Sequence, residues 1–159
     1  MVGIAEIRWA EPLERSALGE LHRRSSRVWE EDRAALEAHP DALGVALEAI
    51  LQRRVRVAVG DMGELLGFSV VADGGPGTCE LDDLFVDAHI LRRGVGRALV
   101  EDAAGRALAE GSRRMTVVAH PRNFPFYESV GFVPGEQAQT RFGPAVRMWR
   151  ELTARGGLS

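Results

Sequence analysis

A glycine-rich turn at residues 91–99 constrains the fold of this chain more than any other stretch, and it reads Leu-Arg-Arg-Gly-Val-Gly-Arg-Ala-Leu. It joins a predicted strand over residues 80–86 to a predicted helix that runs to about Glu110. Glycine allows close approach of the backbone, and the first amides of a helix have no partner within that helix. Those amides and the positive end of the helix dipole favour an anion. The stretch therefore predicts either a phosphate-binding turn or a tight connection beside an exposed basic surface.

The hydrophobic pattern of the whole chain switches between strand and helix periods. Strands are predicted at residues 4–9, 55–59, 65–72, 79–86, 115–119, from 131 onward and at 144–152, and helices at 12–28, 30–38, 41–50, 95–110 and 124–130. Residues 55–86 are predicted to form an antiparallel meander, because only turns and one short loop separate their strands. The strand at 115–119 follows a helix, so it is expected to run parallel to the strand before it. Together these elements predict a mixed α/β layer fold.

The composition is that of an ordinary globular chain, and it disfavours several classes of protein. With 159 residues, of which 45% are hydrophobic, the chain is expected to form one domain over residues 1–159. The formal charge of −3 gives no general attraction to nucleic acid or to an acidic membrane. No apolar run approaches the roughly 18–20 residues that cross a bilayer. The single cysteine, Cys79, excludes an intrachain disulfide and is interpreted as a small buried hydrophobe.

The expected compartment is the cytoplasm, because the N-terminal residues lack the basic and apolar regions of a secretion signal. All twenty basic residues are arginine, which indicates a GC-rich, bacterial genome.

Two well-known phosphate loops do not fit the glycine turn. A Walker loop requires a lysine, and the chain has none. A dinucleotide-binding fingerprint would place a third glycine at the position of Leu99. A phosphate site at this turn would therefore belong to another class.

A second informative stretch, at residues 120–132, reads His-Pro-Arg-Asn-Phe-Pro-Phe-Tyr-Glu-Ser-Val-Gly-Phe. Together with the Arg-Arg-Gly-Val-Gly-Arg of residues 92–97, it resembles the GNAT superfamily of acyl-CoA-dependent N-acyltransferases. The first motif resembles the pyrophosphate-binding loop of that family, and the second resembles its Phe-Tyr-Glu-x-x-Gly-Phe segment. The resemblance implies a GNAT-like α/β fold, a mixed and mostly antiparallel sheet of about six to seven strands with helices on both faces.

The resemblance also implies acetyl-CoA as the cofactor. In the family, main-chain groups of the strand before the turn hold the pantetheine arm, and the turn amides hold the pyrophosphate. Leu91 stands where the family usually has glutamine or arginine, and Asn123 lies closer to Tyr127 than the usual pantetheine-binding asparagine does. The implied cofactor-binding residues are Leu84, Phe85, Val86, Arg92, Arg93, Gly94, Val95, Gly96, Arg97 and Asn123.

Tyr127, the only tyrosine of the chain, matches the residue that commonly protonates the departing thiolate in this family. A phenol has a pKa near 10, so it is protonated at neutral pH and can donate to a thiolate of comparable basicity. The alternative is that Tyr127 is a core aromatic residue beside Phe126. The resemblance further implies direct transfer without an acyl-enzyme, in which the orientation of two bound substrates carries much of the rate.

The reaction also needs a base, because an alkylammonium has a pKa near 10.4 and must lose a proton. Asp83 and His120 are the catalytic candidates, and Glu80 and Asp82 are further carboxylates on the strand before the turn. Strand alternation places Asp82 and Asp83 on opposite faces. Each candidate has a simpler reading, Asp83 as an ion-paired carboxylate and His120 as a loop residue. Many family members carry a glutamate on the strand that here spans residues 115–118, and no carboxylate stands there.

The function implied by the resemblance is transfer of an acetyl group to a primary amine of a small molecule or peptide. The alternative is a non-catalytic GNAT-like module that binds an acyl-CoA as a sensor or partner; Tyr127 favours the transferase, whereas the missing glutamate keeps this alternative open. Neither nucleic acid nor a membrane is expected as a partner, and family members that pair through their last strands imply a homodimer. Candidate residues for the wall of the acceptor site are His22, Ser25, Ser26, Trp29, Glu30 and Glu31.

Overall fold

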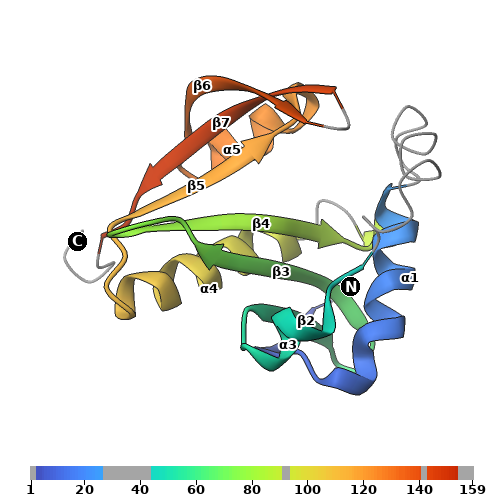
Figure 1. Cartoon of the computed structure of the whole chain (residues 1–159). Coiled ribbons are helices and arrows are strands. Elements are labelled where there is room, and N and C mark those ends of the chain that lie inside the picture. Colours follow the sequence, from blue (N-terminus) through green and yellow to red (C-terminus); the bar gives the residue numbers. More distant parts are fainter. Residues whose placement is uncertain (1–2, 27–43, 91–93, 141–142, 154–159) are drawn as a thin grey trace. The chain divides into compact units, whose positions relative to one another are not determined.

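The computed structural model of the chain describes residues 3–26, 44–90, 94–140 and 143–153. Within these residues, seven strands form one sheet in the order β1-β2-β3-β4-β5-β7-β6 (Figure 1). The strands are β1 (Ile4–Trp9), β2 (Val55–Gly60), β3 (Leu65–Asp73), β4 (Thr78–Val86), β5 (Arg114–Ala119), β6 (Val133–Thr140) and β7 (Gly143–Glu151). The helices are η1 (Pro12–Glu14), α1 (Arg15–Ser26), α3 (Leu47–Leu51), η3 (Ala88–Ile90), α4 (Val95–Ala109), η4 (Pro121–Asn123) and α5 (Phe124–Ser129).

The strand directions confirm the predicted mixed and mostly antiparallel sheet. β4 and β5 are parallel, as expected for strands joined through a helix. The β1–β2, β2–β3, β5–β7 and β6–β7 pairs are antiparallel. Among the described residues, no helix is both long enough and apolar enough to cross a membrane.

Two compact units make up the chain, and each is described by itself. The first combines Met1–Val70 with Asp83–Leu99, and the second combines Val71–Asp82 with Val100–Ser159. The strands β3 and β4 and the helix α4 contribute residues to both units. The expectation of a single domain stays a prediction.

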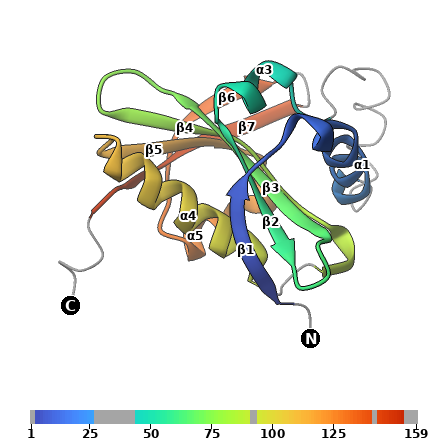
Figure 2. The ribbon, with the colours of Figure 1, turned by 90° about the horizontal axis from the view of Figure 1, so that it is seen from below.

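In the first unit, apolar side chains are buried on both faces of the sheet. Every residue of β2 is buried, and its side chains alternate between two clusters because a strand has a period of two. Val55, Val57 and Val59 join a cluster with residues of α1 and α3, whereas Ala58 joins a cluster with the start of α4. In Figure 2, α1 and the start of α4 lie on opposite sides of β1 and β2. The expectation of helices on both faces is confirmed for this unit.

The second unit is built around β5, with the beginning of β4 on one side and β7 on the other. Met115 and Val117 of β5 are buried in its core. Arg150 of β7 binds the carboxylate of Glu101 in α4 through two hydrogen bonds of 3.0 Å. Cys79 is buried, and burial raises the pKa of its thiol. This environment agrees with the predicted small hydrophobe.

One predicted helix is wrong over part of its length. The pattern predicted a helix from Asp41 to Ile50, but α3 begins at Leu47. Ala46 is extended, with φ −72° and ψ 141°, and Gly44 has a left-handed φ of 77°. Asp41 itself lies outside the described residues.

Bonds to α1 explain why the helix starts late. His22 Nδ1 accepts the N–H of Gly44 at 2.7 Å, and Arg15 Nε donates to the carbonyl of Val45 at 3.0 Å. The carbonyl of Val45 is a group that the predicted helix would have paired internally, whereas the N–H of Gly44 would lie in its first turn and lack a backbone acceptor. The helix predicted at residues 30–38 lies outside the described residues.

Candidate functional site

The last residues of β4 are anchored by their side chains in both cores of the first unit. Leu84 and Val86 pack against the cluster that contains Val95, whereas Phe85 packs against the opposite cluster. The Phe85 ring also lies against the ring of His22, with 3.9 Å between centroids and 31° between planes. Because all three side chains are held, the backbone of this strand segment has a fixed position. The structure thus describes Leu84, Phe85 and Val86 as a rigid backbone segment.

Close approach of β3 and β4 at this segment depends on Gly67, which sequence reasoning missed. A Cβ atom at Gly67 would lie 2.7 Å from the carbonyl oxygen of Phe85, 3.2 Å from Cδ1 of Leu99 and 3.3 Å from Cα of Val86. Only glycine therefore fits there without displacing β4. A lone glycine inside an apolar strand pattern was the available signal, since it often marks close backbone approach.

The glycine turn ends at the start of α4, as predicted. Gly94 has a φ of 83°, a left-handed value that favours glycine, and its carbonyl accepts the N–H of Ala98 at 3.0 Å. The amides of Val95 and Gly96 precede this first bond, so the helix itself supplies no acceptor for them. The first turn of α4 has no acidic residue. This combination can receive an anion.

The arginines of the turn are described only in part. Arg97 is exposed on the first turn of α4. Arg92 and Arg93, which the sequence placed among the cofactor-binding residues, lie outside the described residues, as does Leu91.

Tyr127 lies in α5 with only 8% of its surface exposed. Its ring meets Phe126 and Phe132 edge-on, at centroid distances of 5.1 Å and 5.5 Å. The alternative reading of Tyr127 as a core aromatic residue therefore describes its ring correctly. The two aromatic neighbours also fix the orientation of the ring, and a hydroxyl that acts as a general acid must be held in a fixed orientation.

His120 has a structural task that the sequence did not reveal. It is the N-cap of η4, and its Nδ1 accepts the N–H of Arg122 at 3.2 Å. An imidazole that accepts through Nδ1 carries its proton on Nε2 when it is neutral. Asn123 is half-buried where η4 meets α5, and its N–H donates to the carbonyl of His120 at 2.8 Å. Both residues thus shape the entry into the helix of Tyr127.

The carboxylates of β4 differ in their surroundings. Asp82 is exposed and Asp83 is half-buried, as expected for neighbours on opposite faces of a strand. Glu80 forms an ion pair with Arg147, with 3.5 Å between Oε1 and Nη1. Asp83 is therefore the carboxylate of β4 that is both withdrawn from solvent and close in sequence to the Leu84 backbone.

The residues predicted to line the acceptor wall are only partly described. His22 is 4% exposed and buried against Phe85 and Phe68, so its assignment as a lining residue was wrong. Burial lowers its pKa to about 4, because the charged form loses its hydration there. Ser25 is half-buried and donates its hydroxyl to the carbonyl of His22 at 2.9 Å. The remaining predicted lining residues are outside the described part of the chain: Trp29, Glu30, Glu31 and the side chain of Ser26.

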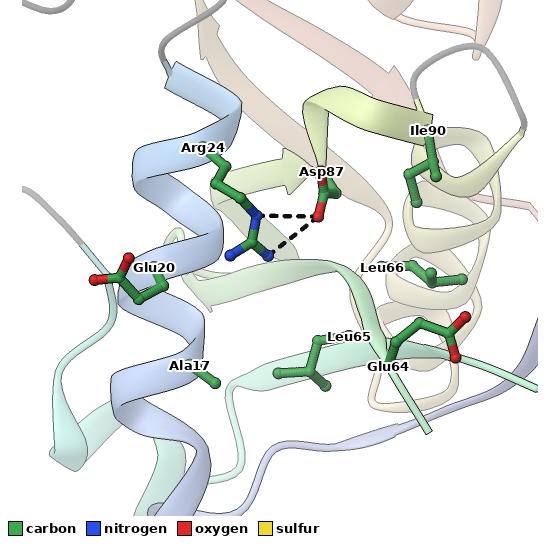
Figure 3. Close-up of a pocket in the computed structure, with 8 residues that line it drawn as sticks. All are labelled: Ala17, Glu20, Arg24, Glu64, Leu65, Leu66, Asp87 and Ile90. Carbon is green, nitrogen blue, oxygen red and sulfur yellow. Dashed lines mark hydrogen bonds and ion pairs between the residues drawn. The ribbon is translucent and has the colours of Figure 1, made fainter. Parts of the chain in front are cut away.

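A pocket of about 460 Å³ lies in the first unit beside the end of β4 (Figure 3). Leu65, Leu66 and Ile90 give it an apolar wall, and the ion pair between Arg24 and Asp87 lies at its rim. Neither Arg24 nor Asp87 belongs to a motif, so sequence reasoning had no signal for them.

A second pocket, of about 370 Å³, lies in the second unit between η4 and the β6–β7 hairpin. Its lining includes Pro121, Gln137, Gln139 and Pro144. One of its lining residues, Pro121, directly follows His120 in the sequence.

Solved structures of acetyltransferases share this fold. A PaiA N-acetyltransferase from Thermoplasma acidophilum, crystallised with coenzyme A, has 20% sequence identity and a TM-score of 0.78 over 92% of this chain and 98% of its own. A GCN5-related N-acetyltransferase from Rhodopseudomonas palustris has 19% identity and a TM-score of 0.77 over 96% and 98%. YncA of Salmonella typhimurium, a putative acetyltransferase solved with acetyl-CoA, has 20% identity and a TM-score of 0.69 over 94% and 95%. At such identities the likeness establishes the fold alone.

The sequence itself supplies the family. Among curated protein sequences, none matches this chain. A family model described as an acetyltransferase (GNAT) domain matches residues 37–151, which include the glycine turn, the β5 strand and the motif around Tyr127. With the fold, the turn and the motif in agreement, the chain belongs to the GNAT acetyltransferase family.

Proposed function

We propose that this protein transfers the acetyl group of acetyl-CoA directly to a primary amine of a small molecule or peptide. The observation that carries the proposal is the start of α4. There a left-handed Gly94 is followed by helical amides that precede the first intrahelical bond and by a first turn without acidic residues, and this arrangement comes after β4 and η3 in the chain. A diphosphate is the part of acetyl-CoA that this arrangement suits.

The residues at the start of α4 fit such a group sterically as well as electrostatically. Among the described residues, a Cβ atom at Gly94 would find no atom within 4 Å, which leaves space beside this residue for a ligand. The backbone amides of Gly94, Val95 and Gly96 would bind the pyrophosphate, with Arg92, Arg93 and Arg97 as charge partners. The pantetheine arm would be bound by the main chain of Leu84, Phe85 and Val86. Asn123 would contribute to the same binding.

Bound acetyl-CoA would supply an activated acetyl thioester, whose transfer forms a C–N bond and breaks the C–S bond. Tyr127 donates its hydroxyl proton to the sulfur that departs, because a phenol with a pKa near 10 is protonated at neutral pH. The edge-on contacts with Phe126 and Phe132 hold the ring during this step. Tyr127 therefore acts as the general acid.

The amine must lose a proton before or during its attack, and two residues are proposed to accept it. Asp83 is half-buried at the end of β4, and its carboxylate is an acceptor when ionised. His120 uses Nδ1 for the cap of η4 and carries its proton on Nε2 when neutral, so it could accept a proton only at Nδ1, with loss of that hydrogen bond.

Calorimetry with coenzyme A is the first test, followed by a thiol-release assay over a panel of amines. Micromolar binding and release of thiol with at least one amine are expected. Absence of binding at high micromolar coenzyme A would contradict the proposed function. Binding without turnover on any amine would instead support a non-catalytic acyl-CoA-binding module, which the absence of a carboxylate at residues 115–118 favours.

The role of Tyr127 is tested by Tyr127→Phe, which removes one hydroxyl from α5. Loss of a general acid is expected to lower kcat by about 100-fold while the affinity for coenzyme A stays nearly constant. Ser129→Ala is the matched control, because it also removes one hydroxyl from α5, and that hydroxyl is exposed and donates to the Phe126 carbonyl at 2.6 Å. Equal kcat in Tyr127→Phe and wild type would exclude the acid role.

A further inference from the structure

Asp87 ends β4 and starts η3 through three hydrogen bonds. Its N–H donates to the carbonyl of Leu66 in β3 at 2.9 Å. Its Oδ1 accepts the N–H of His89 at 3.0 Å, and its own carbonyl accepts the N–H of Ile90 at 3.0 Å. A side-chain acceptor at the first position of a helical turn is an N-cap, and it fixes where that turn begins.

The carboxylate of Asp87 is also held from the side by α1. Arg24 donates a hydrogen bond from Nε to Oδ2 at 3.1 Å, and its Nη2 forms an ion pair with the same oxygen at 3.1 Å (Figure 3). The Asp87 side chain is only 16% exposed, and that of Arg24 is 39% exposed. An ion pair whose carboxylate is largely withdrawn from water and also accepts a backbone N–H holds its geometry better than a fully exposed ion pair does. Asp87 is therefore tied to β3, η3 and α1 at once.

The far end of η3 is fixed as well. Ile90 packs against the cluster that includes Val95 and Leu99 of α4. The short turn η3 is thus held at both ends. At one end the Asp87 carboxylate caps the turn and pairs with Arg24, and at the other end Ile90 packs in the core. This turn lies between β4 and α4 in chain order, and because Ile90 and Val95 share one cluster, the position of η3 is coupled to that of the start of α4.

From these contacts we infer that Asp87, held by Arg24, is a positioning residue for the pyrophosphate-binding start of α4. This inference rests on the function proposed above. Asp87 does not touch the ligand, and it acts by setting the distance between the strand that binds pantetheine and the amides that bind the diphosphate. Diphosphate binding through amides is sensitive to this distance, because hydrogen bonds weaken steeply outside a narrow range.

The test compares a ligand that contains the diphosphate, together with adenosine 3′-phosphate, with a ligand that lacks both groups. Coenzyme A contains both, and pantetheine contains only the arm that β4 would bind. Affinities are measured by calorimetry for coenzyme A and by competition at millimolar concentration for pantetheine. In Asp87→Ala the Kd of coenzyme A is expected to rise by about five- to tenfold, the factor that corresponds to loss of a helix cap. The Kd of pantetheine is expected to stay within about twofold, the ordinary spread of such values.

Two further variants separate the cap from the ion pair. Asp87→Asn keeps an oxygen for the His89 amide but removes the charge that Arg24 binds, and Arg24→Gln removes the pair from the other side. Both are expected to raise the Kd of coenzyme A by about threefold, less than Asp87→Ala, because asparagine is as good an N-cap as aspartate. Arg24→Gln leaves the cap intact, so it gives the result even if Asp87→Ala fails to fold.

The control is Glu14→Gln. Glu14 receives two hydrogen bonds from Arg8, at 2.9 Å and 2.6 Å, in the same unit. This variant loses a comparable ion pair far from η3 in sequence, so it should lower the unfolding midpoint without changing the Kd of coenzyme A. Equal losses for both ligands in Asp87→Ala, or the same loss in Glu14→Gln, would overturn the inference. Failure of the wild type to bind coenzyme A would instead overturn the proposed function, so the two outcomes are distinguishable.

Discussion

The buried histidine of α1 predicts an acid-sensitive stability. His22 is 4% exposed, its Nδ1 accepts the Gly44 amide at 2.7 Å, and its ring lies 3.9 Å from that of Phe85. Burial lowers its pKa from 6.5 to about 4. Acidification is therefore expected to weaken the fold before it protonates His22 in the native state.

The sign and the size follow from the two pKa values. Between about pH 6.5 and pH 4 the unfolded chain binds a proton at His22 and the folded chain does not, so the free energy of unfolding falls as the pH falls. Below about pH 4 both states are protonated and the loss stops. At about 1.36 kcal/mol for each pH unit between the two values, the full loss is about 3 kcal/mol. This is a large share of the roughly 5–15 kcal/mol that stabilise a typical domain.

The assay is urea unfolding of wild type and His22→Gln at about pH 7, 6, 5 and 4.5. Glutamine can still accept the Gly44 amide but does not titrate, so subtracting its pH profile removes the contribution of the carboxylates. Wild type should lose about 2–3 kcal/mol more than the variant over this range. His89→Gln, at an exposed histidine, should keep the wild-type profile. Parallel profiles for wild type and His22→Gln would refute the reasoning.

Three glycine-to-alanine substitutions should change stability in different directions, as measured by chemical unfolding. Gly67→Ala should destabilise the protein by about 1–3 kcal/mol and weaken coenzyme A binding, because its Cβ would meet the Phe85 carbonyl at 2.7 Å. Gly94→Ala meets no atom of the described residues within 4 Å but has a φ of 83°, so a smaller loss of about 1 kcal/mol is expected from the dihedral alone. Gly105→Ala, within α4 and also without a neighbour within 4 Å, should stabilise by up to about 1 kcal/mol through helix propensity. The same sign for all three would contradict this account.

Much of the fold could be predicted from the sequence, because the signals are local. Strand and helix periods, and glycines at turns, are set by residues within a few positions of one another. The α4 helix, from the glycine turn to the stop at Gly111 with φ 102°, was predicted in this way. The parallel pairing of β4 with β5 also followed, because a helix between two strands reverses the chain twice.

The start of α3 and the role of His22 could not be predicted, because they depend on a contact with a distant segment. The pattern of residues 41–50 suits a helix, but His22 and Arg15 of α1 bond to Gly44 and Val45 and keep residues 44–46 out of it. The same contact buries His22, which a polar run on a helix does not indicate. Tertiary hydrogen bonds outweighed local propensity here.

The candidate site likewise has a part that the sequence predicted and a part that only the tertiary structure revealed. The sequence by itself determined the family, through the glycine turn and the Tyr127 motif, because the chemistry of these segments requires particular residue types at fixed spacing. Only the tertiary structure assigned tasks to Gly67 and Asp87, which no motif marks. Their tasks arise from the distance between two strands and from an ion pair across 63 positions of the chain. Such distances are set when the chain folds, and the sequence around each residue does not contain them.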